Sequence, residues 1–402
     1  MNKLYETQSY LKSIITTVEA SEEADGKYYI IPADSIFFPE EGGQYSDTGI
    51  IKASDKVIKV LHGDYLKSKE GDPVIRYEVD SPLEPGTEIE CILDWDNRYD
   101  RMQNHSGEHI MTGMIHNRYG LDNVGFHLSD DAPVTLVMNG VLTKEQVMEI
   151  EVLANKVIYD NVPITDSYRT KEELENISYR SKIDIQGQVR LITIGEKENP
   201  IDVCACCAPH VKRSGEIGII KVVSVMNYKG GVQVGILCGR RALEYINKQQ
   251  NILTSISTAL STAPENVPNI VNSHIEELAA LKGELSSLRE KEHLQQISSM
   301  TGDDIHLIFG NSDLSPVNMK NLFNALTSHF DGYVGIFAGN DSDGYRYYAG
   351  SRNLDSKLLS NMMRESLEAK GGGSFEMIQG KTSSSANEIA AFWQKIQQNS
   401  AS

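Results

Sequence analysis

Two short motifs place pairs of metal-binding side chains four residues apart. His105 and His109 stand at i and i+4 in the segment H-S-G-E-H, and on a helix this spacing puts both imidazoles on one face. Cys206 and His210 repeat the spacing with one thiolate and one imidazole. Zinc takes nitrogen and sulfur ligands of this kind. We therefore predict that the fold brings the two pairs together around one Zn²⁺ ion.

The second motif offers more than one sulfur. Cys204 and Cys207 lie close to Cys206 in the run C-A-C-C-A-P-H, and either of them could bind in its place. Cys206 is favoured because its distance along the chain to His210 equals the distance between the two histidines. Pro209 makes a turn more plausible than a helix in this segment.

A carboxylate stands beside the histidine pair. On a helix, Glu108 lies about 100° from His109 and about 60° from His105, so it could reach a water near the ion and act as a general base. An exposed helix charge is the alternative. Four protein ligands would close a tetrahedral site, whereas catalytic zinc usually keeps one position open. The sequence leaves open whether one ligand is loose, the coordination number rises to five, or the metal mainly positions a substrate.

The patterning indicates which elements hold these residues. Up to residue 93, short β-rich runs at 28–31, 57–61, 74–79 and 89–93 are separated by Gly, Pro and Asp clusters, which predicts a small N-terminal β-barrel or sandwich over 1–93. The segment that follows combines predicted helices and strands, over 101–119, 134–138, 143–160, 189–194, 218–225 and 231–238. Their irregular alternation predicts an α+β fold for residues 94–239, the domain that carries the zinc site.

From Arg240 the pattern changes to helix, with interruptions expected at Pro264 and Pro268. Apolar residues then recur three and four positions apart as an a/d seam of about two and a half heptads. Its members are Val271, His274, Leu278, Leu281, Leu285 and Leu288. We expect 240–300 to be a helical spacer or dimer arm, with a helical hairpin packed on a neighbour as the alternative.

The remaining residues, 301–402, alternate between strand and helix patterns and are predicted to form a compact C-terminal α/β domain. A glycine run at 371–373 enters one of its strands, and no phosphate-loop or dinucleotide motif surrounds it. A homodimer is possible through this domain or through 240–300.

The composition bounds the class of protein. The chain has 402 residues, of which 40% are hydrophobic and 23% charged, so several folded domains are expected and wholesale disorder is excluded. We find no leader pattern at the start and no long apolar run, so the expectation is no membrane association and no secretion. Five cysteines, an odd number, fit a reducing compartment, and cytoplasm is expected. Cys91 and Cys238 stand alone and are expected to be buried small hydrophobic residues.

The net charge of −18 argues against indiscriminate binding to polyanions. The stretch from Cys204 to Gln250 nevertheless holds seven Lys or Arg against two Glu. This basic stretch could face a phosphate backbone, and a plain solvated surface is the alternative.

Together the motifs resemble the stand-alone alanyl-tRNA editing proteins, the AlaX family, in the long form that is also similar to the C-terminal half of alanyl-tRNA synthetase. The resemblance covers nearly the whole chain. Its carriers are F-P-E-E-G-G-Q at 38–44, the family's H-x-x-x-H at 105–109, its C-x-x-x-H-V at 206–211, S-G-E-I-G at 214–218, and the glycines 371–373 with Q-G at 379–380, which look like a DHH-associated domain.

The resemblance implies a zinc-dependent hydrolase that removes wrongly attached serine, with glycine as an alternative, from the tRNA for alanine. A synthetase pocket for a small side chain rejects an isostere with one extra hydroxyl by only about a hundredfold, so a second site must hydrolyse the mischarged ester. The acceptor end of tRNA(Ala) is then the expected partner. We expect Gln44, Asp47 and Thr48 near the terminal adenosine or the amino acid. The expected phosphate contacts are Lys212, Arg213, Arg240 and Arg241.

Two departures from the synthetases bear on amino-acid selectivity. Where they usually have C-G-G-T-H, this chain has C-C-A-P-H at 206–210, and Glu108 stands where they often have threonine.

Two other classes of function are carried as alternatives. One is a zinc metallopeptidase of the H-x-x-E-H type with Glu108 as base. The other is a non-catalytic RNA-binding protein with a structural zinc.

Overall fold

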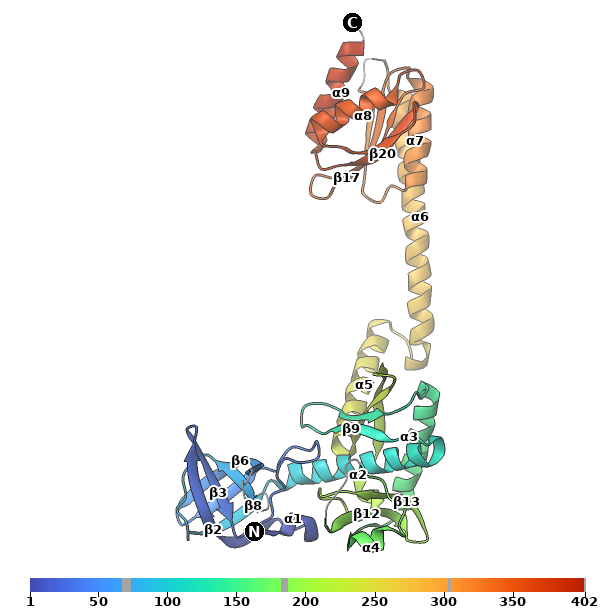
Figure 1. Ribbon diagram of the computed structural model, residues 1–402. Helices are drawn as coiled ribbons and strands as arrows, with labels where there is room; N and C mark the ends of the chain where they lie inside the picture. The colour runs from blue at the N-terminus through green and yellow to red at the C-terminus, as the bar shows by residue number, and fades with distance from the viewer. Residues whose placement is uncertain (67–73, 182–186, 303–304, 401–402) are drawn as a thin grey trace. The chain divides into compact units, whose positions relative to one another are not determined.

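The computed structural model describes residues 1–66, 74–181, 187–302 and 305–400 (Figure 1). The chain forms two compact units, Met1–Leu253 and Thr254–Ser402, and the metal-binding motifs both lie in the first. Over the described ranges, none of the helices combines the length and the apolar character needed to span a bilayer. The finer division at 93, 239 and 300 stays a prediction.

Six antiparallel strands close into a barrel at the start of the first unit, in the order β2-β3-β7-β6-β5-β8. They are β2 (Ser13–Ala24), β3 (Lys27–Pro32), β5 (Gly49–Ala53), β6 (Lys56–Leu66), β7 (Val74–Val79) and β8 (Glu88–Leu93). Burial alternates along β7 and β8, as expected when one face of each strand fills the barrel. Cys91 is among the inward residues. The predicted N-terminal β-barrel is therefore confirmed.

Helix α2 (Trp95–Tyr119) follows the barrel and carries both histidines of the first motif. The Asp94 side chain caps it by accepting a hydrogen bond from the Asn97 N–H, and Gly120 ends it in a left-handed conformation. The helix is buried along most of its length, because other elements cover it on several sides. It therefore forms a rigid axis for the site.

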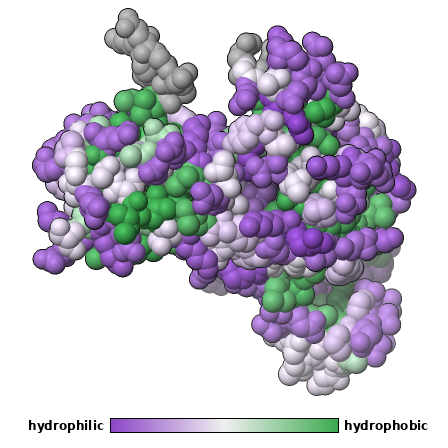
Figure 2. Space-filling model, turned by 90° about the horizontal axis from the view of Figure 1, so that it is seen from below, coloured by the Kyte–Doolittle hydropathy of each residue, from purple (hydrophilic) through white to green (hydrophobic). Residues whose placement is uncertain are grey.

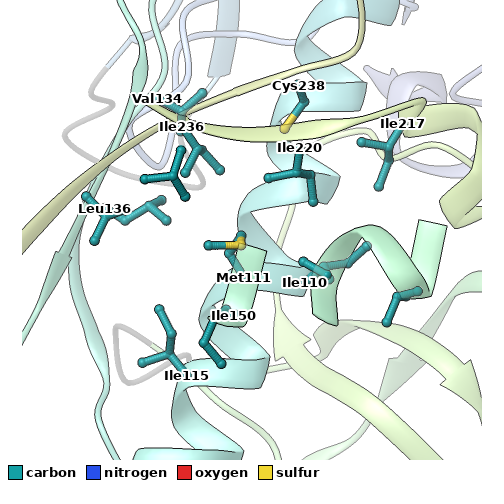
Figure 3. Close-up of a cluster of buried hydrophobic side chains, with 14 of the residues drawn as sticks. Ile110, Met111, Ile115, Val134, Leu136, Ile150, Ile217, Ile220, Ile236 and Cys238 are labelled. Carbon is teal, nitrogen blue, oxygen red and sulfur yellow. The ribbon is translucent and has the colours of Figure 1, made fainter. Parts of the chain in front are cut away.

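A four-stranded sheet and helix α3 (Lys144–Asp160) pack against α2. The sheet has the order β14-β15-β10-β9, with β9 (Asn123–His127), β10 (Val134–Met138), β14 (Ile220–Tyr228) and β15 (Gly231–Cys238). Figure 3 shows the core that results, where Ile110 and Met111 of α2 meet Ile150 of α3 and Leu136 and Ile236 of the sheet. Cys238 lies in the same core, so both isolated cysteines are buried as expected.

A second, three-stranded antiparallel sheet carries the other half of the site. It consists of β11 (Ile164–Arg169), β12 (Val189–Glu196) and β13 (Asn199–Ala205). β13 leads directly into the Cys206–His210 segment. The short elements of the unit are β1 (Asn2–Lys3), α1 (Leu4–Thr7), β4 (Asp34–Ser35), α4 (Lys171–Leu174) and η1 (Ser214–Ile217).

Helix α5 (Gly239–Ala259) spans the boundary between the two units, and η2 (Pro264–Asn266) and the 33-residue helix α6 (Val267–Ser299) follow it. Pro268 lies in the first turn of α6, where its missing N–H costs nothing, so it begins the helix instead of interrupting one as expected.

The rest of the second unit is a five-stranded sheet with helices. The strand order is β16-β17-β18-β20-β19. The strands are β16 (Leu307–Gly310), β17 (Val334–Asn340), β18 (Gly344–Gly350), β19 (Lys370–Gly373) and β20 (Met377–Thr382), and the helices are α7 (Pro316–His329), α8 (Ser356–Leu367) and α9 (Ala386–Ser400). Together with the first unit this makes the chain a mixed α+β protein, as predicted.

Candidate metal centre

The fold brings the two ligand pairs together. His105, His109, Cys206 and His210 each offer one ligand atom, and these atoms all lie within 4.8 Å of one another. Cys206 Sγ lies 3.6 Å from His105 Nε2 and 3.3 Å from His210 Nε2. Three imidazoles and one thiol, buried or nearly so, form a donor set suited to a tetrahedral divalent ion.

The second pair lies on an irregular turn held by a buried arginine. After β13 the chain leaves the sheet, and Arg190 Nη1 donates to the carbonyl oxygens of Cys206 and Ala208, at 3.1 and 2.8 Å. Arg190 Nη2 donates to the Glu6 carbonyl oxygen at 3.1 Å. The turn expected at Pro209 is therefore fixed in place by a side chain from β12.

Each histidine has its Nδ1 occupied by a second group. Gln44 Oε1 lies 2.6 Å from His105 Nδ1, and Ser106 Oγ lies 3.0 Å from His210 Nδ1. Asp202 Oδ2 lies 3.2 Å from His109 Nδ1. Such outer partners fix the ring orientation and leave Nε2 for a metal. The arrangement of the three rings thus fits a bound ion.

Asp202 is itself held by Arg180. Arg180 Nε and Nη2 donate to its two carboxylate oxygens at 2.7 and 2.8 Å. Asp202 also belongs to a second potential ligand group, with His109 and Cys204. Because both groups contain His109, they are neighbouring parts of one centre.

The G-G-Q turn of the barrel supplies Gln44. Glu41 and Gln44 exchange backbone hydrogen bonds across Gly42 and Gly43, which both have positive φ values, of 61° and 88°. A side chain at Gly43 would overlap the Phe126 carbonyl oxygen of β9, so glycine permits this close approach. This turn places the Gln44 side chain against His105.

The protonation states of Cys206 and His210 suit metal binding. Burial raises the pKa of the Cys206 thiol. The charges of His105 and His210 lower this pKa by a larger amount, so the net pKa of Cys206 lies well below its usual range. Burial lowers the pKa of His210 to about 3. A thiolate and a neutral imidazole are the forms that bind a metal.

The pKa values of the ligand His109 and of two neighbouring groups, Cys207 and Asp202, shift in other directions. Burial and the nearby Cys206 and Glu41 raise the pKa of Cys207. Burial lowers the pKa of His109, but the charges of Cys204 and Glu108 and a bond to Asp202 more than offset it, and the net pKa is raised. The pKa of Asp202 is lowered in spite of burial, because His109 and Arg180 favour the carboxylate.

Glu108 is buried beside the ligands. Its Oε2 lies 3.6 Å from His109 Nε2, and its Oε1 accepts from Asn123 Nδ2 at 2.6 Å and from Thr112 Oγ1 at 3.3 Å. Burial is contrary to the alternative of an exposed helix charge. A carboxylate held in this way is fixed at the edge of the metal centre.

The centre opens onto a cavity of about 440 Å³. His105, Glu108 and His109 line one side of it, and Cys204, Cys206 and Cys207 line another. The remaining polar and charged lining residues are Lys3, Glu6, Glu41, Tyr168, Ser181, Gln188 and Arg190. A small polar molecule could therefore reach the ligand cluster and Glu108.

The expected substrate-binding residues lie apart from this lining. Asp47 is buried, accepts from the Phe38 N–H at 2.7 Å, and pairs with Arg98 of α2. The Thr48 carbonyl oxygen accepts from the Asp94 N–H at 3.0 Å. Both residues connect the G-G-Q loop to the start of α2, and Gln44 supports His105.

The expected phosphate-binding residues divide into two kinds. Lys212, Arg213 and Arg240 are exposed. Arg241 is only 8% exposed, and its guanidinium donates to Asp100 Oδ2 at 2.7 Å and to the Ser129 carbonyl oxygen at 2.6 Å. The expectation that Arg241 contacts tRNA is at odds with this placement, because its charge is already neutralised inside the fold.

The sequence interpretation missed the outer residues of the centre. Asp202, Arg180, Arg190 and Asn123 lie in no motif, so nothing in the sequence pointed to them. Ser106 lies between the two histidines, and its position in the motif was the only available signal.

The chain is similar to several known proteins. Residues 189–233, which contain Cys206 and His210, match the family "Threonyl and Alanyl tRNA synthetase second additional domain". The chain is 26% identical to the alanyl-tRNA editing protein Aarsd1-B of Xenopus laevis, over 92% of this chain and 88% of that protein. It is 27% identical to the alanyl-tRNA editing protein AlaX-L of Pyrococcus horikoshii, over 72% of this chain and 71% of that protein.

An alanine–tRNA ligase is also similar. That of Ignicoccus hospitalis is 27% identical over 92% of this chain and 40% of the ligase. Residues 189–233 thus resemble a domain of the kind found in threonyl- and alanyl-tRNA synthetases. The resemblance to the alanyl-tRNA editing proteins that the sequence predicted is confirmed.

Proposed function

We propose that this chain is a zinc-dependent hydrolase that deacylates mischarged Ser-tRNA(Ala), with Gly-tRNA(Ala) as a second substrate. One observation carries the proposal: a cluster of three imidazoles and a thiol opens onto a cavity where Glu108 is fixed. Each imidazole Nδ1 in this cluster has a polar partner. The names of its relatives, the alanyl-tRNA editing proteins, indicate the substrate class.

The residues present fit a zinc ion. His105, His109, Cys206 and His210 would hold it, and the pKa shifts of Cys206 and His210 favour the protonation states that zinc needs. When bound, zinc polarises an ester carbonyl or lowers the pKa of a water toward about 7. Four donors make a closed site unless one is displaced, so the chain's own base carries much of the chemistry.

Glu108 is the base in this proposal. Its carboxylate takes a proton from the water whose oxygen attacks the ester carbon, and the ester bond to the ribose oxygen then breaks. The same proton passes to the leaving ribose oxygen, which releases serine and intact tRNA. Asn123 and Thr112 hold the carboxylate in one orientation during both transfers.

The exposed cations Lys212, Arg213 and Arg240 are proposed to contact tRNA phosphates, while the burial of Arg241 assigns it a structural role. Charge reversal at Lys212 and Arg213 should weaken tRNA binding and flatten its dependence on salt.

Asp47 and Thr48 are proposed to act on the substrate only indirectly, through the loop that carries Gln44. Free thiols at all five cysteines fit the proposed cytoplasmic location.

Deacylation of Ser-, Gly- and Ala-tRNA(Ala), measured in parallel before and after chelation and with zinc restored, tests the function. We expect rapid release of serine, slower release of glycine, and little release of alanine, with all activity lost on chelation. Release of all three at the same slow rate would contradict the proposal. Activity that persists in a metal-free, folded protein would contradict the zinc dependence.

A structural zinc in a non-catalytic RNA-binding protein is the second candidate, because the donor set is complete with four ligands. It predicts tRNA binding without release of any amino acid, and unfolding when the metal is removed. The H-x-x-E-H peptidase alternative expects a glutamate as the third ligand. In the described residues, Cys206 and His210 stand with the histidine pair instead.

A further inference from the structure

Glu41 stands on the wall of the cavity that opens onto the metal centre. Its Oε2 accepts a hydrogen bond from Tyr65 Oη at 2.9 Å, and the Cys207 thiol is hydrogen-bonded to the same carboxylate. Both of these donors are neutral. Arg190, on the same lining, donates to backbone carbonyl oxygens instead. The Glu41 carboxylate is thus held in place by groups that leave its negative charge unbalanced.

Two other carboxylates belong to the described lining, and each is already engaged. Glu6 Oε1 lies 3.7 Å from Lys3 Nζ, and Glu6 Oε2 accepts from Tyr168 Oη at 2.6 Å, so a cation of the chain itself balances Glu6. Glu108 is the base of the proposed reaction. Within the part of the chain that the structure describes, Glu41 has no ion pair of the kind that joins Glu6 to Lys3. Glu41 therefore contributes an unpaired negative charge to the cavity.

The turn that orients His105 also positions Glu41. Glu41 and Gln44 exchange backbone hydrogen bonds, with N-to-O distances of 3.2 and 3.0 Å. Gln44 Oε1 lies 2.6 Å from His105 Nδ1. Tyr65 of β6 holds the Glu41 side chain from a neighbouring strand of the barrel. The Glu41 carboxylate and the ligand cluster are therefore positioned by one local framework, and both line the same cavity.

An aminoacyl ester brings a cation to such a site. The α-amino groups of peptides have pKa values of about 7.7–8.0, and a nearby carboxylate favours the ammonium form. The α-ammonium group is attached to the carbon next to the ester carbonyl, so it must enter any site that receives that carbonyl. A carboxylate on the wall of the site complements the positive charge and accepts its N–H groups.

We propose that Glu41 binds the α-ammonium group of the aminoacyl ester, which restricts the site to esters of amino acids whose α-amino group is free. This role rests on the proposed function. An N-acylated amino acid, such as the last residue of a peptidyl-tRNA, has a neutral and bulkier amide in place of the ammonium group. Its binding would leave the Glu41 charge desolvated and unpaired. The chain therefore hydrolyses aminoacyl-tRNA and spares peptidyl-tRNA.

Binding of two inert analogues to the full chain, supplied with Zn²⁺, tests this role without catalysis. One analogue is 3′-amino-3′-deoxyadenosine with L-serine joined to the 3′-amino group as an amide. The other carries 3-hydroxypropanoate in place of serine, so it lacks only the α-amino group. By calorimetry, wild type should bind the seryl analogue roughly 10- to 100-fold more tightly, and Glu41→Gln should reduce this preference to about threefold or less. Equal binding of both analogues by wild type, or an undiminished preference in Glu41→Gln, would overturn the proposal.

Two further variants serve as matched comparisons. Glu40 is the neighbouring carboxylate along the chain, but it lies outside the described lining, with its Oε2 3.8 Å from His62 Nδ1. Glu40→Gln should therefore keep the wild-type preference. Glu6→Gln removes a lining carboxylate that Lys3 already balances, so it should also keep most of the preference. Loss of the preference in Glu6→Gln together with its retention in Glu41→Gln would assign the ammonium group to Glu6 and contradict the proposal.

Deacylation of Ser-tRNA(Ala) and of its N-acetylated form separates this role from the proposed function. Wild type should have a kcat/KM roughly 10- to 100-fold lower for the N-acetylated form. Glu41→Gln should raise the KM for Ser-tRNA(Ala) roughly tenfold with little change in kcat, because the ammonium contact exists before and during the reaction. Serine release by wild type with an unchanged KM in Glu41→Gln would overturn the role of Glu41 alone. A wild type that releases no serine would contradict the proposed function, and the analogue binding would still decide whether Glu41 recognises the ammonium group.

Discussion

Gln44 Oε1 lies 2.6 Å from His105 Nδ1, although Gln44 belongs to a loop of the barrel and His105 to helix α2. The amide oxygen accepts the Nδ1 proton, which selects the tautomer whose Nε2 is free to bind a metal. The barrel thus supplies part of the candidate metal centre.

Replacing Gln44 by alanine should therefore weaken zinc affinity by about 10- to 100-fold, because His105 loses the partner that orients its ring. Gln44→Glu keeps an acceptor at the same place and should retain most of the affinity. Competition with a zinc-binding dye measures both variants. If Gln44→Ala left zinc affinity unchanged and raised only the KM for tRNA, Gln44 would be a substrate contact.

Glu108→Gln should reduce deacylation of Ser-tRNA(Ala) by about 10²- to 10⁴-fold, since the amide cannot take a proton from water. The variant should still bind zinc, because the four ligands are untouched. Single-turnover rates and the zinc content of the same preparation are the measurements. A joint loss of activity and zinc would show that Glu108 serves the structure of the centre.

Cys206 should be the only thiol whose loss removes the metal. The charges of His105 and His210 lower the pKa of Cys206, whereas burial and nearby negative groups raise that of Cys207. Cys206→Ala should therefore abolish zinc binding, and Cys204→Ala and Cys207→Ala should keep it. Retention of zinc by Cys206→Ala together with its loss in Cys204→Ala would place the ion between His109, Asp202 and Cys204 instead.

The ligand pairs could be predicted from the sequence because their spacing is local. Four residues bring His105 and His109 to one face of any helix, whatever surrounds it. The barrel strands β3, β6, β7 and β8 were predicted for the same reason, from runs of β-branched and aromatic residues between turns. Strand β2 was missed because its C-terminal half contains three glutamates, so a run of apolar residues does not indicate a strand there.

The outer residues of the centre could not be predicted, because tertiary packing alone brings them close. Asp202 is separated from His109 by 93 positions, and no local pattern records their contact. The prediction that Arg241 contacts tRNA is at odds with its burial for a related reason. Net charge along the chain cannot reveal that Asp100, 141 positions away, neutralises its guanidinium in the interior.

Two glycine-to-alanine changes should alter stability in opposite directions. A Cβ at Gly107 of α2 would overlap Cys238 Sγ of β15 in the buried core, so Gly107→Ala should destabilise the first unit by about 1–3 kcal/mol. Gly283 lies in the middle of α6 with open space around it, at position f outside the seam, so Gly283→Ala should stabilise the second unit by about 0.5–1 kcal/mol. Denaturant unfolding of both variants, each compared with wild type at its own unit's transition, measures the two changes. A stabilising Gly107→Ala would mean that α2 and β15 are not packed at this point, which would weaken the account of how α2 holds His105 and His109 in place.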